Sequence, residues 1–197
     1  MAHEAERAAY EAIAANCGAT HPTPPWLQRP DRSECGERWE LIVEIHRLLE
    51  GEELEDVMPS RETRRVDGVF QYRGRWFLFE LDETQHFNAY RAKTLEVYPP
   101  DLALAFGKDA WIGRCREKVK LEGGGWARPR PPLFPGANGR HRQRAFRDAL
   151  ADLVPSVHGF LPTLRLGDRE IDLTLSPADA KQRMAELLRQ RLDAHVS

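Results

Sequence analysis

Three carboxylates, Asp67, Glu80 and Asp82, are the residues of this sequence best placed to do chemistry together. Residues 65–72 and 75–82 predict an antiparallel hairpin, and in that register Asp67 faces Glu80. Because side chains alternate along a strand, the three carboxylates share one face. Opposed Cβ atoms lie roughly 5 Å apart, where like charges repel. A divalent cation such as Mg²⁺, which prefers oxygen ligands, would neutralise them, and phosphodiester hydrolysis is then the leading chemistry.

The hairpin that positions these carboxylates is expected to turn at Arg73 and Gly74, with Tyr72 opposite Arg75. Its second face is apolar and is expected to pack against the core of the protein. The residues on this second face are Val66, Phe70, Phe77, Phe79 and Leu81. The hairpin is therefore predicted to have one core face and one acidic face.

The elements around the hairpin follow from hydrophobic period and turn residues. Residues 2–16 predict an Ala-rich helix, and the Pro-rich stretch 20–30 predicts an extended arm. Residues 36–50 predict an amphipathic helix. The other expected elements are a weak strand near Val57, a helix over 87–97 and a buried strand over 102–106. The predicted order is helix, three strands, helix, strand.

The C-terminal part of the sequence predicts further helices and a second hairpin. Helices are expected over 110–121 and 140–154, separated by a long loop rich in Gly and Pro. Residues 160–175 predict a hairpin that turns at Gly167 and Asp168. Ser176 and Pro177 then predict the N-cap and the first turn of a final helix.

Length and composition favour one domain with peripheral additions. The chain has 197 residues, of which 41% are hydrophobic and 30% charged, as is ordinary for a soluble globular domain. We expect a helix and arm over 1–33, a core over 34–107, and an extension packed on the same domain over 108–197. The first 17 residues contain three glutamates and no uninterrupted apolar run. A cytoplasmic location without membrane contact is therefore expected.

Cysteine spacing and charge distribution narrow the classes of partner. Three cysteines lie far apart without a C-x-x-C pair, which argues against a zinc ribbon and a disulfide framework. The formal net charge is only −2, but bases outnumber acids from Lys108 to Arg147, and this stretch could hold a phosphate backbone. The candidate phosphate contacts are Arg140, Arg142, Arg144 and Arg147. Solvated helix faces, or pairing with the acidic segment from Glu52 to Asp56, remain as alternatives.

The order of elements, with Asp67 on one strand and Glu80 and Asp82 on the next, resembles the PD-(D/E)XK nuclease superfamily. The run Phe79-Glu-Leu-Asp-Glu-Thr-Gln-His86 is similar to its branch of small proteins related to very-short-patch repair endonucleases. There, an acid-x-Asp strand end is followed within a few residues by histidine. The resemblance covers roughly residues 36–107. It implies a restriction-endonuclease-like α/β fold with an αβββαβ core and a mixed central sheet, cleavage that depends on Mg²⁺ or Mn²⁺, and DNA as the commonest substrate.

The resemblance also implies roles for individual acids. Asp67 and Glu80 would be metal ligands, and Asp82 is a third candidate ligand. The metal would polarise a phosphoryl oxygen and lower the pKa of a bound water. In the usual pattern of the family, however, a lysine stands at the position of Asp82. Another residue would then have to support the attacking water or the developing charge.

Four residues that follow the second strand are candidates for the role of the absent lysine or for binding phosphate. Gln85, His86 and Lys93 could replace the lysine, and His86 could also act as a general acid or a further ligand. Arg91 could grip a phosphate. A capping role for His86, and a solvated helix surface for Lys93 and Arg91, are the alternatives.

Three classes of function stay open. The first is a metal-dependent nuclease that acts on nucleic acid, with DNA favoured, in restriction, repair or defence. The second is a nucleic-acid-binding protein on a nuclease fold that has lost catalysis, which the missing lysine favours. The third is a partner-binding protein whose carboxylates hold a cation or an arginine of a neighbour. Since cutting both strands needs two active sites or two events, a homodimer is compatible with the first class.

Overall fold

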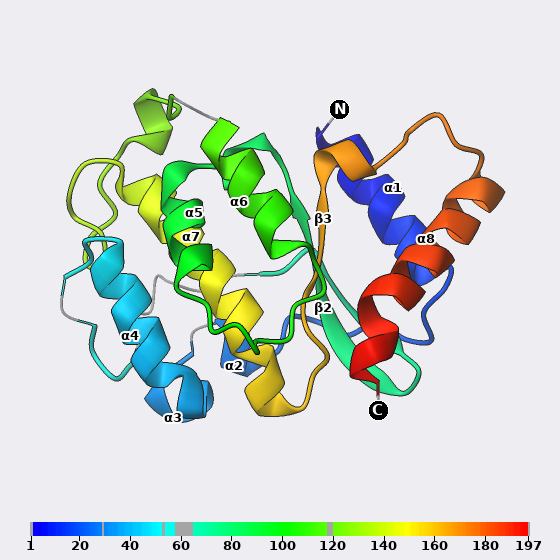
Figure 1. Cartoon of the computed structure of the whole chain (residues 1–197), viewed down its shortest axis with the longest axis horizontal. Helices are drawn as coiled ribbons and strands as arrows, with labels where there is room; N and C mark the ends of the chain where they lie inside the picture. Colours follow the sequence, from blue (N-terminus) through cyan, green and yellow to red (C-terminus); the bar gives the residue numbers. More distant parts are fainter. Residues whose placement is uncertain (1, 29, 53, 58–64, 118–119, 197) are drawn as a thin grey trace.

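A three-stranded mixed sheet lies at the centre of the computed structural model, with helices on both sides (Figure 1). The structure describes residues 2–28, 30–52, 54–57, 65–117 and 120–196. The strands are β1 (Gly68–Tyr72), β2 (Arg75–Asp82) and β3 (Leu164–Gly167), in the order β1-β2-β3. Strand β1 pairs antiparallel with β2, and β3 pairs parallel with β2. The protein is therefore of the mixed α/β class, as predicted.

The hairpin has the predicted register. Gly68 pairs with Phe79 across the two strands. Asp67 is the residue before β1, so the same register continues from Asp67 toward Glu80. The first strand is shorter than predicted, because regular pairing begins at Gly68 rather than at residue 65.

The turn of the hairpin explains why its register is fixed. Tyr72 pairs with Arg75, which leaves Arg73 and Gly74 as the two loop residues. Their φ angles are 47° and 82°. A type I′ turn requires positive φ at both central positions, and its twist matches that of the strands it joins.

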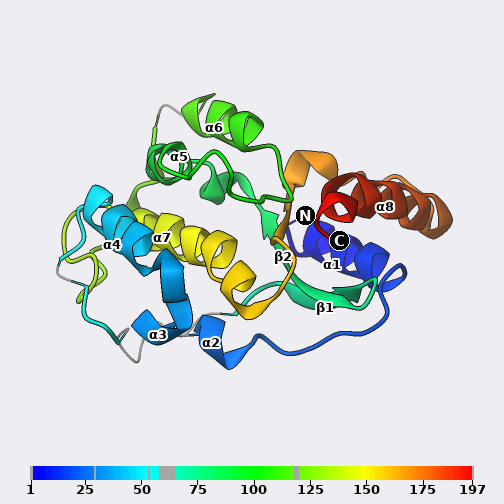
Figure 2. The ribbon, with the colours of Figure 1, turned by 60° about the horizontal axis from the view of Figure 1, so that its bottom comes forward.

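Two terminal helices cover one face of the sheet (Figures 1 and 2). They are α1 (Ala2–Ala14) and α8 (Pro177–Leu192), and α8 is capped by Ser176 as predicted. Between them and the sheet lies a buried group that we call the α1–α8 cluster. Its larger members are Ile13, Phe70, Phe77, Phe79, Leu81, Leu161, Leu164, Leu166, Met184, Leu188 and Leu192.

Four helices form the other side of the molecule (Figures 1 and 2). They are α4 (Trp39–Leu48), α5 (Ala89–Glu96), α6 (Lys108–Glu117) and α7 (Gly139–Leu153). Their apolar side chains form a second core, which we call the α4–α7 cluster. Its larger members are Trp39, Ile42, Ile45, Leu49, Leu95, Tyr98, Trp111, Phe134, Phe146, Leu150 and Leu153.

Short helical segments connect these elements. Two are short α-helices, α2 (Pro25–Gln28) and α3 (Arg32–Cys35). The 3-10 turns are η1 (Gly36–Arg38), η3 (Thr84–His86), η4 (Gly124–Trp126), η5 (Pro155–His158), η6 (Asp168–Glu170) and η7 (Asp193–His195).

Three predicted strand segments differ from the structure. Val57 forms only an isolated bridge with Asp31, and residues 102–106 contribute only a bridge from Ala105 to Leu164. In the predicted second hairpin only β3 is a strand, because η6 follows it directly and the pairing partner of β3 is β2. The order of strands expected for an αβββαβ core is therefore not found in the described residues.

Smaller corrections concern one side chain and two helix ends. Val66 packs with Val69 and Leu78 rather than on the Phe70 face. The helix predicted over 87–97 begins at Ala89, because Asn88 caps it by accepting hydrogen bonds from the backbone N–H groups of the first turn. The helix predicted over 110–121 spans Lys108–Glu117, and residues 118–119 lie outside the described residues.

The three segments predicted from the sequence share their cores. The α1–α8 cluster joins residues from both ends of the chain to the hairpin, and the α4–α7 cluster joins residues 35–106 to residues 111–154. Among the described residues, no helix combines the length and the apolar composition needed to cross a membrane.

Candidate functional site

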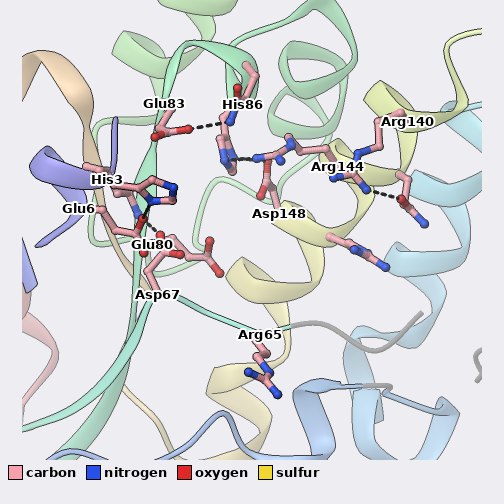
Figure 3. Close-up of a pocket in the computed structure, with 14 residues that line it drawn as sticks. His3, Glu6, Arg65, Asp67, Glu80, Glu83, His86, Arg140, Arg144 and Asp148 are labelled. Carbon is pink, nitrogen blue, oxygen red and sulfur yellow. Dashed lines mark hydrogen bonds and ion pairs between the residues drawn. The ribbon is translucent and has the colours of Figure 1, made fainter. Parts of the chain in front are cut away.

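A cavity of about 370 Å³ lies where the hairpin, the start of α1, the turn after β2 and helix α7 come together (Figure 3). We call it the central cavity. It gathers seven of the residues that the sequence predicted for a site. These are Asp67, Glu80, Gln85, His86, Arg140, Arg144 and Arg147.

Asp67 and Glu80 line the cavity from the two neighbouring strands (Figure 3). Oδ2 of Asp67 accepts a hydrogen bond of 2.7 Å from the backbone N–H of Leu81. This bond ties the residue before β1 to β2 and orients the Asp67 carboxylate. Glu80 is only 4% exposed, so its carboxylate is almost removed from bulk water. The two acids thus bring carboxylate oxygens to one wall of the cavity.

His86 connects the cavity with the protein interior. Its Nδ1 atom lies 3.1 Å from Oδ2 of Asp148, and its Nε2 atom contacts the guanidinium of Arg144. A guanidinium only donates hydrogen bonds, so Nε2 accepts from Arg144. The proton of the neutral imidazole is then on Nδ1 and is donated to Asp148. These two contacts fix both the orientation and the tautomer of the ring.

Asp148 remains ionised beside this imidazole. Burial raises the pKa of its carboxyl group, but its contacts with His86 and Arg165, among them the hydrogen bond from His86, outweigh burial and hold the pKa well below its usual value. An ionised acceptor strengthens the hydrogen bond from Nδ1 of His86. The orientation of the histidine is therefore supported over the whole neutral range of pH.

Helix α7 presents three of its four predicted arginines to the central cavity. Arg140, Arg144 and Arg147 line it, as their spacing of three and four residues on a helix allows. Arg142 points elsewhere: its guanidinium lies 2.7 Å from a carboxylate oxygen of Glu50 and is nearly buried. The prediction that all four arginines form one phosphate-binding surface therefore needs correction for Arg142. Two positions along a helix turn a side chain by about 200°.

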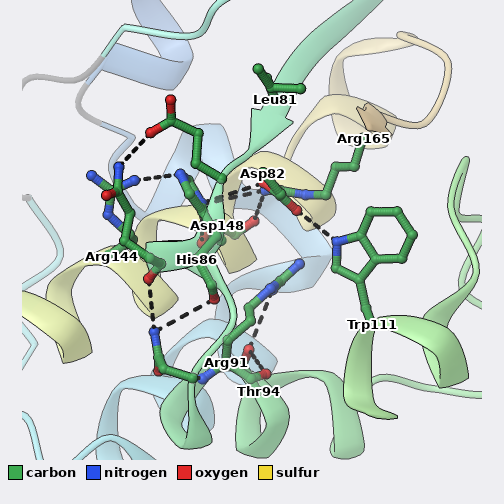
Figure 4. Close-up of polar contacts among 12 residues, drawn as sticks. Leu81, Asp82, His86, Arg91, Thr94, Trp111, Arg144, Asp148 and Arg165 are labelled. Atoms are coloured by element: carbon green, nitrogen blue, oxygen red, sulfur yellow. Dashed lines mark hydrogen bonds and ion pairs between the residues drawn. The ribbon is translucent and has the colours of Figure 1, made fainter. Parts of the chain in front are cut away.

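Asp82 lies behind the cavity and not in it (Figure 4). It is 1% exposed, and each of its carboxylate oxygens has a strong donor. Oδ1 accepts from Nη1 of Arg165 at 2.6 Å, and Oδ2 accepts from Nε1 of Trp111 at 2.7 Å. The carboxylate of Asp82 is therefore a partner of interior groups.

Arg165 is the centre of this buried network. It pairs across the sheet with Glu80 in the register of β2 and β3, and it is fully buried. Besides Asp82 it binds Oδ1 of Asp152 through Nε at 2.6 Å and the backbone carbonyl of Asp148. Burial lowers the pKa of Arg165, but the surrounding carboxylates, Asp152 first, raise it well above its usual value. The guanidinium is a permanent buried cation.

Arg91 belongs to the same interior and not to the surface. It is 1% exposed, and its Nη2 donates to Asp152 at 2.6 Å. Its Nη1 donates to the hydroxyl of Tyr98 at 3.1 Å. The predicted phosphate contact is therefore wrong for Arg91 in this structure, because its guanidinium is enclosed by its partners.

The two remaining predicted residues differ in position. Gln85 lines the cavity and donates to Glu83 at 2.6 Å. Lys93 is exposed on α5, with Nζ 5.8 Å from the ring centroid of Tyr90, and does not line the cavity.

Asp82, His86 and Asp148 together could hold a metal ion. One ligand atom from each lies within 4.8 Å of the other two, and all three residues are buried. This group combines a nitrogen with two oxygens, a donor set that suits transition metals. Arg165 already contacts both carboxylates, at 2.6 Å to Asp82 and 3.6 Å to Asp148. An added cation would therefore compete with a buried guanidinium.

Several residues around the site escaped the sequence analysis. His3, Glu6, Arg65, Glu83 and Asp148 also line the cavity, and Arg165 lies beneath it. Asp148 follows Arg144 by four residues on the predicted helix, which is a signal that it would face the same side. No local signal identifies His3, because α1 comes to lie beside the hairpin only through tertiary packing with Phe70 and with α8.

A scan against protein-family models and searches of curated proteins and of solved structures found no match to this chain.

Proposed function

We propose that the protein is a metal-dependent phosphodiesterase that cleaves nucleic acid, with DNA as the favoured substrate. The observation that carries the proposal is the position of Asp67 and Glu80. They are the residues next to the paired Gly68 and Phe79, and they line a cavity that three arginines of α7 also line. Carboxylates that bind a hard cation, next to guanidinium groups that bind phosphate, are the parts that phosphodiester hydrolysis needs.

Asp67 and Glu80 fit Mg²⁺ or Mn²⁺ better than the buried group does. They offer only oxygen, and the cavity of about 370 Å³ has room for the waters that Mg²⁺ retains. The buried Asp82, His86 and Asp148 instead face the permanent cation of Arg165. When bound, the metal would activate a water and polarise a phosphoryl oxygen.

The other residues of the cavity have proposed roles that follow from their contacts. Arg140 and Arg147 bind the phosphate backbone on either side of the reacting group. Arg144 supplies the positive charge near the developing negative charge, in place of the lysine that Asp82 replaces. His86 accepts from Arg144 at Nε2 and donates to Asp148 at Nδ1, and so it positions the Arg144 guanidinium beside the reacting phosphate.

The test is cleavage of supercoiled, linear and single-stranded DNA, and of RNA, with Mg²⁺ or Mn²⁺. Glu80→Gln keeps the size of the side chain and removes its charge. We expect cleavage to fall by about a hundredfold or more, since a metal supplies several kcal/mol of transition-state stabilisation. Glu96→Gln, which changes a surface acid paired with Arg116, is the control and should retain activity.

Two results would contradict the proposal. One is cleavage that continues in EDTA or in Glu80→Gln at wild-type rate, which would point to a contaminant or a different site. The other is the absence of cleavage of every substrate with either metal, while thermal unfolding shows a folded protein.

A second candidate is a nucleic-acid-binding protein without catalysis. The interior position of Asp82 favours it, because a residue that usually supports the attacking water is used here to hold Arg165 and Trp111. Binding of DNA or RNA without turnover, weakened by Arg147→Gln, would select this alternative.

A further inference from the structure

Two further cavities share lining residues with the central cavity. One, of about 370 Å³, shares Arg65 and Asp67 with it. The other, of about 490 Å³, shares Leu81, Glu83 and Gln85 with it. We call the three neighbouring cavities together the site groove. We call the cavity that shares Arg65 the Arg65 end, and the cavity that shares Leu81 the Leu81 end.

Helix α1 contributes to every part of this groove. Tyr10 lines the Arg65 end, His3 and Glu6 line the middle, and Ala5 lines the Leu81 end. Figure 3 shows the start of α1 beside Glu80 and Asp67. The first helix of the chain is thus one wall of the groove along its length.

The Leu81 end is mostly apolar, the Arg65 end has aromatic rings among polar side chains, and the middle is charged. At the Arg65 end, Tyr10 is 37% exposed with its ring 5.0 Å from that of Phe70, and the ring of His21 lies 5.6 Å from that of Trp76. At the Leu81 end, Ile171 and Leu173 lie close to Leu81, and Leu173 is 44% exposed. Exposed apolar side chains that border a charged site are typical of a binding surface.

We propose that the site groove binds one extended nucleic-acid strand, with unpaired bases at both ends and the phosphates in the middle. This placement of the phosphates rests on the proposed function. Bases of a single strand can turn outward and contact aromatic or apolar side chains, whereas bases in a duplex are covered by their neighbours. The arginines of α7 follow the backbone between the two ends.

The length of the groove also favours a polymer over a mononucleotide. A mononucleotide would occupy the charged middle and one end at most. Two separate base-contacting ends, with Tyr10 on one and Leu173 on the other, are useful only to a ligand that continues past the reacting phosphate in both directions.

The first measurement is the affinity for short single-stranded DNA and RNA and for the matching duplex. Fluorescence anisotropy with Ca²⁺ in place of Mg²⁺ reports binding, and a gel confirms that the oligonucleotides stay intact. Tyr10→Leu keeps apolar contact with Phe70 and removes the ring, and Leu173→Ala shortens the side chain at the other end. Each should weaken single-strand binding by about fivefold or more and leave duplex binding unchanged.

Matched controls separate binding from folding. Tyr10→Phe keeps the ring and should bind like wild type. Val57→Ala removes an exposed apolar side chain, 54% exposed, that lines none of the three cavities, and should also bind like wild type. Thermal unfolding of each variant shows whether it is folded. If Tyr10→Leu does not fold, the comparison of Leu173→Ala with Val57→Ala still tests whether the groove binds a single strand.

The outcomes distinguish this inference from the proposed function. The proposal that the groove binds a single strand is wrong if the protein binds duplex more tightly than single strand. It is also wrong if Leu173→Ala and wild type bind single strand equally. If duplex DNA is nevertheless cut with Mg²⁺ and Glu80→Gln is inactive, the proposed function is kept and the single-strand groove is rejected. Conversely, single-strand binding that needs Tyr10 and Leu173, without cleavage under any condition, supports the groove and removes the catalytic role.

Discussion

Glu80 and Asp82 lie two residues apart on the same side of β2, yet their surroundings differ completely. Glu80 lines the central cavity, whereas Asp82 holds Arg165 and Trp111 in the interior. The difference arises because Arg165 of β3 and Trp111 of α6 bind the carboxylate of Asp82, whereas Glu80 lies beside the cavity that α7 also lines. One short motif therefore supplies both a candidate metal ligand and a structural acid.

The structural role of Asp82 leads to the first prediction. Asp82→Ala removes a carboxylate from a fully buried guanidinium and leaves the indole N–H of Trp111 without its acceptor. Breaking a buried ion pair from one side costs about 3–5 kcal/mol in the free energy of unfolding. Chemical denaturation measures this, and Asp101→Ala, at an exposed position, should change the value by less than about 0.5 kcal/mol. An equal effect of the two substitutions would contradict the role of Asp82.

His46 leads to a prediction about pH. Burial between Phe134 and Phe146 lowers the pKa of its imidazole from 6.5 to about 4. As the pH falls below 6.5, the unfolded chain takes up a proton at this residue, whereas the folded protein does so only near pH 4. The free energy of unfolding should therefore decrease across this window.

The measurement for His46 compares pH profiles of unfolding. In His46→Gln the decrease between pH 6.5 and pH 4 should be smaller than in wild type, because no imidazole titrates at this position. His3→Gln, at an exposed position on α1, should keep the wild-type profile. Parallel profiles for wild type and His46→Gln would show that His46 does not contribute.

At the residue scale, the sequence could predict contacts made within one hairpin. The pairing of Tyr72 with Arg75 is as predicted, because a two-residue turn fixes the register of its strands. Arg165 could not be placed in this way. It lies 83 residues after Asp82, and the alternation of apolar and polar residues around it does not reveal which strand it joins.

Helix α7 joins the interior to the site at the scale of elements. Arg140, Arg144 and Arg147 line the cavity, while Asp148 and Asp152 bind the buried arginines. The sequence predicted this helix almost to the residue, since its apolar period is strong. It did not predict that the acids on its inner side would hold arginines of α5 and β3, because that depends on packing between distant elements.

The first residue of α7 gives a prediction about its placement. A Cβ atom at Gly139 would lie 2.6 Å from the backbone N of Arg130 and closer still to the carbonyl oxygen of Phe134. Backbone atoms cannot relieve this overlap by changing rotamer, as a side chain can. Gly139→Ala should therefore destabilise the protein by about 1–3 kcal/mol. It should also weaken the proposed nucleic-acid binding, because α7 carries three arginines that line the cavity.

A second glycine provides the control. Gly113 lies inside α6, and a Cβ atom there would meet no atom within 4 Å. Gly113→Ala should leave stability unchanged or raise it by about 0.5–1 kcal/mol, because alanine favours the helix. Thermal unfolding of the two variants tests both expectations. A loss of stability in Gly113→Ala equal to that in Gly139→Ala would contradict them.

At the same scale, the predicted strands beyond the hairpin were mostly wrong. Residues 102–106 are apolar and buried in part, as the pattern indicated, but they form one bridge instead of a strand. Strand β3 takes the position beside β2, and it comes from the segment where an antiparallel hairpin was predicted. A short apolar run shows that a segment is buried, but not which partner it pairs with.

At the scale of the whole molecule, the sheet joins two cores. The α1–α8 cluster includes Phe77 and Phe79 of β2. Asp82, at the end of the same strand, accepts a hydrogen bond from Trp111 of the α4–α7 cluster. Loss of packing on one side should therefore destabilise the other side as well.

Leu188→Ala tests this coupling. Leu188 is fully buried in the α1–α8 cluster, so its truncation should cost about 2–5 kcal/mol. Trp39 and Trp111 lie in the other cluster, and their fluorescence should report the same lowered unfolding midpoint as far-UV circular dichroism. Leu187→Ala, at a half-buried neighbour, should have a smaller effect. Two separate transitions would show that the clusters unfold independently.

The packing of α1 against α8 has a consequence for the protein during its synthesis. The ribosome makes α1 first, but the apolar side of α1 finds its partners Leu188 and Leu192 only when α8 has been made. Until α8 has been made, the wall that carries His3, Glu6 and Tyr10 lacks the packing that Leu188 and Leu192 supply. The nascent chain can thus complete the hairpin early, while the groove beside it takes shape last.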